Sequence, residues 1–368
     1  VYWDSRYAGI FQFVQQNVQK FMAEMKPNNV TDIAIATSIF RPGPLGIGAD
    51  KLYLNNRKNP KKISYKHPLL EEVLADTSGL IVFQEQLQLI YHKLAGIPLE
   101  DTDAVRKAFT KKDLSNKDKA AKEREAMRED FADRCLATNN IAKEISYSIF
   151  DEMEKFVAYS FNKSHAVAYA ITSYQCAWFL TYYPDEWITT YIDYCATEKG
   201  RQAGKEDPKA IALSEAKALG FTIGKPDVNL SEKEYTIRDG KLIPSFASLK
   251  HVGMTVLSEI NECRPYNTIE DLLFNPNDTW RHSKFNKRAL STLIKLEAFE
   301  SMGLVGEDKM FKNYRQLHHV LVDKGDDVKR AINRKKNKNH KEVLQKLIEE
   351  AQNLEDFTLN EKVEFSKQ

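Results

Sequence analysis

The longest run of this chain without a charged residue, from Ala166 to Pro184, is long enough to cross a lipid bilayer as a helix. Polar groups interrupt it at Thr172, Ser173 and Gln175, and four tyrosines add further polar atoms. These groups would be costly to place in hydrocarbon. We therefore predict a buried helix of a soluble protein, and no membrane partner.

The length and the charge balance limit what kind of protein this can be. The chain has 368 residues, more than one hydrophobic core usually organises, so two or three domains are expected. Lys and Arg number 54 and Asp and Glu 52, which gives a formal net charge of +2. This excludes a globally basic nucleic-acid arm, and any basic surface must come from local segregation of charge. Such a segregation occurs at residues 51–66, which hold five Lys and one Arg but no acidic residue.

The amino-terminal residues and the cysteines favour a cytoplasmic location. The chain starts with neither the basic nor the apolar region of a signal peptide, and it lacks an initiator Met, so we expect it to begin within a longer gene product. The cysteines are far apart and form no CxxC pair. This excludes a disulfide scaffold and a Cys-based zinc site and fits a reducing compartment. They are Cys135, Cys176, Cys195 and Cys263.

Local patterns predict a mainly α-helical chain. Val14–Met25 carries an apolar stripe at helical spacing, and a second helix is expected to start at Asn29. That helix must end at residues 41–48, which contain two Pro and three Gly. Residues 163–196 are expected to form the apolar helix and its successor, separated at Pro184. A charged helical stretch at residues 113–158 is expected to bury Phe131, Ile141, Ile145, Ile149, Phe150, Met153 and Phe156.

Few strands are expected, and the end of the chain is polar. Segments 235–238 and 241–243 flank Asp239-Gly240, a two-residue hairpin signal, and a further short strand is expected at 221–223. From Gly306 onward we expect a polar helical or flexible tail. Within it, residues 324–346 carry nine Lys or Arg against three Asp or Glu. A solvated helix or a linker accounts for this excess, and contact with a DNA backbone is the alternative.

A search for catalytic motifs finds none. The chain has no HExxH, no GxSxG and no phosphate-binding loop with its Lys. Nucleotidyl transfer needs paired carboxylates that hold two Mg²⁺ ions. The acidic clusters here lie on expected helix surfaces, where a solvated face explains them. No metal site is therefore predicted from the residues themselves.

Residues 245–253 predict a helix-hairpin-helix unit. A short helix, a turn written Lys250-His251-Val252-Gly253 and a second helix would place backbone N–H groups beside a DNA phosphate. Glycine at the turn allows a close approach of the backbone. An ordinary helical turn is the alternative. A related unit at residues 286–302 lacks the glycine, so we expect it to pack rather than to bind.

Two further segments could contact a nucleotide. In the first, Asn162 or Ser160 can cap a helix, Lys163 adds charge to its first turn, and His165 shares a face with Tyr169. Phosphate with a stacked base suits such a face, and core packing is the alternative. The second segment puts cations on two successive helical turns, which can bracket a triphosphate. Plain surface solubility is the alternative for these cations, Arg106, Lys107, Lys111 and Lys112.

Taken together, these stretches occur in an order that resembles one family. The quoted motifs are Phe11-Gln-Phe13, Phe40-Arg-Pro-Gly-Pro-Leu45, His67-Pro-Leu-Leu-Glu71, Ile81-Val-Phe-Gln-Glu-Gln86, Leu94-Ala-Gly96, Arg106-Lys-Ala-Phe-Thr-Lys-Lys112, Tyr159-Ser-Phe-Asn-Lys-Ser-His-Ala166 and Tyr174-Gln175. The chain resembles the C family of DNA polymerases, the bacterial replicative DNA polymerase III alpha subunits, from about residue 6 to about residue 303. This covers the fingers domain and the tandem helix-hairpin-helix region that follows it.

The resemblance implies roles for particular residues. In that family the fingers close over the incoming deoxynucleoside triphosphate (dNTP), opposite the templating base. By carry-over, Arg106 and Lys107 would contact the triphosphate, with Lys111 and Lys112 near it. Arg41 would lie at the edge of the active site. Tyr159, Asn162, Lys163 and His165 would lie against the nascent base pair, and Lys250, His251, Val252 and Gly253 would hold the duplex backbone.

The chain departs from the family pattern at several motifs. Lys107 stands where the family usually has a second Arg, and Lys lacks the bidentate fork. Phe109-Thr110 replaces the usual Met-Gly, Val14-Gln15 the usual Glu-Ser, and Glu297-Ala-Phe-Glu300 the Gly-Ala-Phe-Asp of the second hairpin. These departures weaken the transfer of family roles to this chain, above all the triphosphate contact of Lys107.

The resemblance also implies what this chain does not carry. The three catalytic aspartates of the family lie in a palm region upstream of Phe11-Gln-Phe13, and they hold the Mg²⁺ ions. We therefore expect a piece of a polymerase, from a truncated or split gene, with a phage gene as one origin, and inactive on its own. Its expected partners are primer-template DNA, dNTPs, the missing palm and, as a candidate, the sliding clamp, in the nucleoid or a host cytoplasm. A non-catalytic DNA-binding accessory module is the alternative. The expected domains are fingers at 1–200, helix-hairpin-helix region at 201–305 and tail at 306–368.

Overall fold

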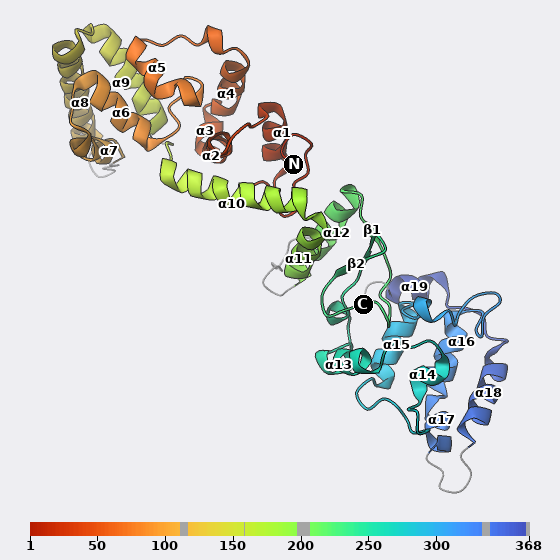
Figure 1. The fold of residues 1–368 in the computed structure, drawn as a ribbon. Helices are drawn as coiled ribbons and strands as arrows, with labels where there is room; N and C mark the ends of the chain where they lie inside the picture. Colours follow the sequence, from red (N-terminus) through yellow and green to blue (C-terminus); the bar gives the residue numbers. More distant parts are fainter. Residues whose placement is uncertain (111–116, 158, 197–206, 333–338, 366–368) are drawn as a thin grey trace. The chain divides into compact units, whose positions relative to one another are not determined.

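The computed structural model describes residues 1–110, 117–157, 159–196, 207–332 and 339–365 (Figure 1). Contacts divide the chain into two compact units, Val1–Tyr182 and Tyr183–Gln368, and each is described by itself. The described residues are mostly α-helical, with one small sheet, which confirms the predicted fold class. The domain boundaries expected at residues 200 and 305 stay predictions.

The first unit is a set of helices joined by short turns. A 3-10 turn, η1 (Pro60–Lys62), follows its fourth helix, and another, η3 (Leu99–Asp101), precedes its seventh. Its α-helices are α1 (Gln16–Met25), α2 (Val30–Ile39), α3 (Pro42–Gly46), α4 (Ala49–Lys58), α5 (Pro68–Leu74), α6 (Gln84–Ala95), α7 (Thr102–Thr110), α8 (Lys117–Asn139), α9 (Lys143–Val157) and α10 (Lys163–Tyr182).

Local signals set the first helices as expected, with two differences. The Asn29 side chain accepts the N–H of Asp32 at 2.9 Å and caps α2. The Pro- and Gly-rich segment ends α2, but its prolines then open the short helix α3, because the first turn needs no proline N–H. Val14, expected in the apolar stripe of α1, precedes that helix and is 63% exposed.

The long helix α10 packs along α2 with one face only. That face is made of small side chains, Ala166, Ala170, Ser173 and Ala177, which let two helix backbones approach closely. On the opposite side large aromatic side chains are exposed, among them Tyr182 at 65%. The expectation of a fully buried helix is therefore wrong for half of its surface, because the run alternates small and aromatic residues around the helix. None of the helices in the described part of the chain is long and apolar enough to span a membrane.

Helices α5 to α9 enclose one apolar cluster of the first unit. Its centre is aromatic, with the Tyr91 and Phe131 ring centroids 4.7 Å apart and those of Phe109 and Phe150 5.1 Å apart. Phe131 and Phe150 are fully buried, as expected. Ile145 instead lies on the outer side of α9 and is 38% exposed, since the buried stripe of that helix passes through Ile149.

The second unit combines helices with a small sheet. Its strands are β1 (Thr222–Ile223), β2 (Thr236–Arg238) and β3 (Lys241–Ile243), in the order β1-β3-β2. Strand β3 pairs parallel to β1 and antiparallel to β2. Its α-helices are α11 (Pro184–Ala196), α12 (Pro208–Ala218), α13 (Met254–Cys263), α14 (Ile269–Leu273), α15 (Lys287–Lys295), α16 (Tyr314–His318), α17 (Gly325–Ile332), α18 (His340–Ala351) and α19 (Leu359–Phe365).

The hairpin between β2 and β3 confirms the turn signal. Asp239 and Gly240 both have positive φ, 50° and 73°. This is the backbone that a two-residue hairpin with right-handed strand twist requires.

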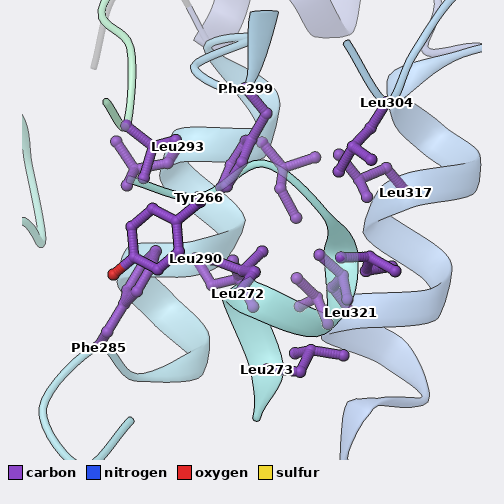
Figure 2. Packing of buried hydrophobic residues seen from close by; sticks show 14 of the residues in the cluster. Tyr266, Leu272, Leu273, Phe285, Leu290, Leu293, Phe299, Leu304, Leu317 and Leu321 are labelled. Atoms are coloured by element: carbon purple, nitrogen blue, oxygen red, sulfur yellow. The ribbon is translucent and has the colours of Figure 1, made fainter. Parts of the chain in front are cut away.

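The core of the second unit draws on the polar end of the chain (Figure 2). Tyr266, Leu293 and Phe299 pack in one cluster with Leu317 and Leu321, which lie beyond Gly306. The segment after Gly306 is therefore part of a folded core in the residues described there, although its composition is polar. An amphipathic helix needs only one apolar stripe, and α17 and α18 each supply one.

Candidate functional site

The amino ends of α6 and α10 meet through a short stretch of paired backbone. The N–H of Phe161 donates to the carbonyl oxygen of Val82 at 3.1 Å, and the N–H of Gln84 donates to that of Phe161 at 3.0 Å. Phe83 and Phe161 form the resulting parallel bridge. This pairing brings the residues that precede the two helices side by side.

Glu85 closes the amino end of α10. One oxygen of its carboxylate accepts the N–H of Lys163 at 2.9 Å, and the other accepts the side-chain amide of Asn162 at 2.8 Å. Asn162 in turn accepts the N–H of His165 at 2.9 Å, so Asn162 rather than Ser160 is the cap. The helix end that was expected to attract an anion thus already holds an internal carboxylate.

Arg41 binds the segment before α10. Its Nη2 donates to the carbonyl oxygen of Tyr159 at 2.8 Å, and its guanidinium lies 4.1 Å from the centroid of the Phe161 ring. Its Nε donates to the carbonyl oxygen of Ser38 at 3.0 Å, which ties the same side chain to the end of α2. Burial lowers the pKa of Arg41 from its usual value.

Tyr159 sits directly against the backbone of Gly43. A Cβ built on Gly43 would overlap the Tyr159 ring, since its distance from Cε1 would be 2.8 Å and from Cγ 2.9 Å. Any other residue at position 43 would displace the ring. The glycine of the Arg41-Pro-Gly turn is therefore needed for close approach.

Aromatic rings continue from this point along α10. The His165 ring is 5.2 Å from that of Phe161 and 4.1 Å from that of Tyr169, and Phe11 is 5.1 Å from Tyr169. An open pocket of about 390 Å³ lies beside them. Arg41 and the rings of Phe13, Phe161, His165 and Tyr169 are part of its lining.

The cations of α7 are held by one carboxylate. Asp103 accepts Nε of Arg106 at 2.8 Å and pairs with the ammonium of Lys107 at 2.9 Å. The hydrogen bond from Lys107, and then that from Arg106, hold the pKa of Asp103 below its usual value. Nη1 of Arg106 also lies 3.4 Å from the side-chain oxygen of Gln84, at the start of α6.

The structure therefore brings most of the expected nucleotide residues of the first unit into one neighbourhood. Arg106 reaches Gln84, the adjacent Glu85 holds Asn162 and Lys163, and the Lys163 ammonium lies 5.7 Å from the Phe83 ring. Arg41, Tyr159 and His165 continue the same contact chain. Lys107 is 70% exposed at its side chain and bound to Asp103. Lys111 and Lys112 lie outside the described residues.

Sequence reasoning gave no role to Glu85, Gln84 or Asp103. Gln84 and Glu85 belong to the motif Ile81-Val-Phe-Gln-Glu-Gln86, which by itself assigns them no function. A carboxylate three and four residues before two cations is a readable signal for Asp103, because such residues share a helix face. No comparable local signal exists for Glu85, whose partner lies 78 residues away.

The expected duplex-binding turn has its own geometry. Val252 is buried, while Lys250, His251 and Gly253 are exposed. Gly253 precedes α13 and offers no side-chain cap, and a Cβ built on it would meet no atom within 4 Å. The positive φ of this turn, 69°, belongs to His251. The exposed side of the turn is thus the start of α13, whose N–H groups can donate hydrogen bonds to an anion.

The second hairpin packs into the core of its unit, as expected from its sequence. Ala298 and Phe299 are fully buried, and the carbonyl oxygen of Ala298 accepts the N–H of Val228 at 2.8 Å. Glu297 takes a positive φ of 60°, at the place where the glycine is absent. That this unit packs without binding DNA stays a prediction.

Comparison with known proteins agrees with both regions. Residues 3–135 match the model of the bacterial DNA polymerase III alpha subunit finger domain, and residues 220–308 match a helix-hairpin-helix motif. DNA polymerase III subunit alpha of Pseudomonas aeruginosa is 32% identical over 304 residues, which are 80% of this chain and 24% of that protein. The protein of the same name from Borreliella burgdorferi is 29% identical over 334 residues, 90% of this chain and 27% of that protein. The chain spans about a quarter of the length of these relatives.

The fold and the matched regions define a polymerase segment composed of a finger domain and a helix-hairpin-helix motif. More particularly, the chain belongs to the family of bacterial DNA polymerase III alpha subunits, which confirms the resemblance read from its motifs.

Proposed function

We propose that this chain is the part of a DNA-directed DNA polymerase that binds the incoming dNTP and the primer-template duplex. The observation that carries the proposal is the convergence of Arg41, Lys163 and Arg106 on the paired backbone of Phe83 and Phe161. Arg41 lies over the Phe161 ring, Lys163 lies over the Phe83 ring, and Arg106 reaches the adjacent Gln84; three cations gathered in this way suit a triphosphate with its base.

Each group in the neighbourhood has a distinct task in this proposal. Arg106 and Lys107 exchange the carboxylate of Asp103 for phosphate oxygens, so the triphosphate replaces an internal anion. The Arg41 guanidinium and the Lys163 ammonium neutralise charge that develops during phosphoryl transfer. The rings of His165 and Tyr169 lie against the base. Positioning and charge neutralisation are the whole contribution of these residues.

The Mg²⁺ ions are assigned by the proposal to palm carboxylates that this chain does not supply. In the part of the chain that the structure describes, no group of three or more His, Cys, Asp or Glu side chains could hold a metal ion. The acids of the neighbourhood, Glu85 and Asp103, are engaged by Lys163, Arg106 and Lys107. The described residues therefore do not fit a resident metal ion.

The helix-hairpin-helix turn is the proposed duplex-binding element. Without a side chain at Gly253, a phosphate can approach the first N–H groups of α13, and Lys250 adds a charge. Gly253→Ser keeps a good helix cap but fills the open space. We expect it to weaken duplex binding about tenfold with unchanged thermal stability.

The test is fluorescence anisotropy of the full chain on a primed template at several salt concentrations, with primer extension in the same tube. Lys250→Ala should weaken binding and lower the slope of log affinity against log salt concentration by about one, whereas Lys155→Ala on α9 should leave both unchanged. Equal effects of the two substitutions would contradict the assignment. Extension by the chain alone would contradict the placement of the catalytic carboxylates outside it. Extension that appears only when a palm polypeptide is added would instead rule out the accessory-module alternative.

A further inference from the structure

The acid-free segment at residues 51–66 contributes no residue to the candidate nucleotide site. Arg57 in this segment is internal, since its guanidinium binds the Asp32 carboxylate at 2.7 and 2.9 Å and the carbonyl oxygen of Met25 at 3.0 Å. Lys66 pairs with Glu152 at 2.8 Å. The remaining cations, Lys51, Lys58, Lys61 and Lys62, are all exposed.

Most of these lysines carry uncompensated charge. Among the described residues, no carboxylate pairs with Lys51, Lys61 or Lys62. Lys58 pairs with Glu24 at 2.6 Å, but both side chains are more than half exposed, at 55% and 53%. Such a pair contributes little to stability and can exchange for another anion.

The lysines follow one another along the chain from α4 into the turn η1. Lys51 and Lys58 are seven residues apart on α4, so they share a face and lie about 10 Å apart along the helix axis. The turn η1 follows α4 directly and adds Lys61 and Lys62 beyond its carboxyl end. A row of cations of this kind matches a row of phosphates rather than a single anion.

An aromatic platform lies at the side of this row. The Trp3 ring is 56% exposed, and its Nε1 donates to the carbonyl oxygen of Pro27 at 3.0 Å, which fixes its orientation. The Lys26 ammonium is 6.0 Å from the ring centroid. An open pocket of about 330 Å³ has Trp3, Lys26, Arg57 and Lys58 in its lining together with the Glu24 carboxylate, so the indole faces a hollow with three cations and one acid on its rim.

We propose that this surface, which we call the Trp3–α4 surface (Trp3, Lys26, Lys51, Lys58, Lys61 and Lys62), binds single-stranded nucleic acid. An unpaired base stacks on the Trp3 ring and the sugar-phosphate backbone follows the lysines. Cations in a row beside an exposed aromatic ring are how proteins hold single strands without reading their sequence. A duplex keeps the faces of its bases stacked, so it can offer phosphates to the lysines but no base to Trp3. The inference rests on the proposed function and adds to it a place for unpaired template.

The test compares an oligodeoxythymidine of about 20 nucleotides with a blunt duplex of the same length, each dye-labelled, by anisotropy with the full chain. Lys61→Glu/Lys62→Glu should weaken single-strand binding about tenfold. It should also reduce the slope of log affinity against log salt concentration by about 1.4. Trp3→Ala should weaken it about tenfold, whereas Trp3→Phe keeps a stacking ring and most of the affinity. The charge-matched control, Lys122→Glu/Lys155→Glu on α8 and α9, should leave the affinity unchanged.

The proposal is overturned by any of three results. These are unchanged single-strand affinity in the Lys and Trp3 variants, an equal loss in the control, and an equal loss of duplex affinity in the Trp3→Ala variant. Failure of the proposed function is seen separately, because it would remove the effects of Gly253→Ser and Lys250→Ala on duplex binding. Circular dichroism of each variant establishes that a loss of binding is not a loss of fold.

Discussion

The carboxylate of Glu85 accepts the main-chain N–H of Lys163 at 2.9 Å, so the first turn of α6 completes the amino end of α10. The two residues are 78 positions apart in the chain. A phosphate that approaches this helix end meets the side chains of Lys163 and Arg41, because Glu85 and Asn162 already accept the N–H groups of Lys163 and His165. The binding face is therefore one of side-chain cations and rings.

Removal of the Glu85 carboxylate should destabilise the first unit. Glu85→Ala leaves the Lys163 N–H and the Asn162 amide without their acceptor, which costs about 1–2 kcal/mol of unfolding free energy. Glu85→Gln keeps an oxygen acceptor and should cost less. Urea denaturation followed by circular dichroism measures both, with Glu100→Ala on the exposed turn η3 as the control. A Glu85→Ala protein as stable as the wild type would disprove the capping role.

Gly43→Ala should be destabilising, since the new Cβ would meet the Tyr159 ring. Overpacking of this kind costs about 1–3 kcal/mol. Gly46 in the same short helix is the matched control, because a Cβ there would meet nothing within 4 Å. Gly46→Ala should be neutral or slightly stabilising. Thermal unfolding of the two variants separates them, and equal melting temperatures would show that the Tyr159 contact has no energetic weight.

Asp103 should compete with a triphosphate for the cations of α7. Asp103→Asn weakens the hold on Arg106 and Lys107, so we expect a fluorescent dATP analogue to bind the chain about threefold more tightly, while Arg106→Ala should bind it about tenfold more weakly. Asp101→Asn in the preceding turn is the control. Because the pKa of Asp103 is lowered, its charge persists throughout pH 5–8, and this group should add no pH dependence there. Weaker binding by Asp103→Asn would be incompatible with competition.

Asp193 should make the second unit less stable as the pH rises. Burial raises the pKa of this carboxyl to about 6, although it accepts the N–H of Tyr235 at 3.0 Å. The folded state therefore binds the proton more tightly than the unfolded chain, and stability falls as pH increases from about 4 through about 6. Asp193→Asn keeps the acceptor without the charge. It should be more stable than the wild type at pH 8 by on the order of 1 kcal/mol, discounted for partial exposure, but not at pH 4. Urea titrations at the two pH values measure the difference, and a difference that did not change with pH would exclude this origin.

Features that depend on neighbouring residues were predictable from the sequence. The cap at Asn29, the hairpin at Asp239-Gly240 and the break at Pro184 each need only a few adjacent residues, and the structure has all three. The matched motifs also predicted which segments gather near the site. The order of the motifs along the chain identifies these segments even where a single residue does not.

Features that depend on distant partners were not predictable. No local pattern connects the residues that make three contacts of the site. These are the cap from Glu85, the stacking of Arg41 on Phe161 and the packing of Tyr159 against Gly43. The exposed face of α10 was missed for another reason. Composition alone does not tell whether an aromatic side chain in an apolar run faces a neighbouring helix or the solvent.

The contact between Tyr159 and the Arg41 turn has a mechanical consequence. Tyr159 occupies the space beside Gly43 that a side chain would need, and Arg41 holds the carbonyl oxygen of the same tyrosine across 118 positions of the chain. Neither segment can slide past the other while both contacts last. A ligand that drew the Arg41 guanidinium toward itself would break the hydrogen bond to Tyr159 and leave only the Gly43 packing to hold the two segments together.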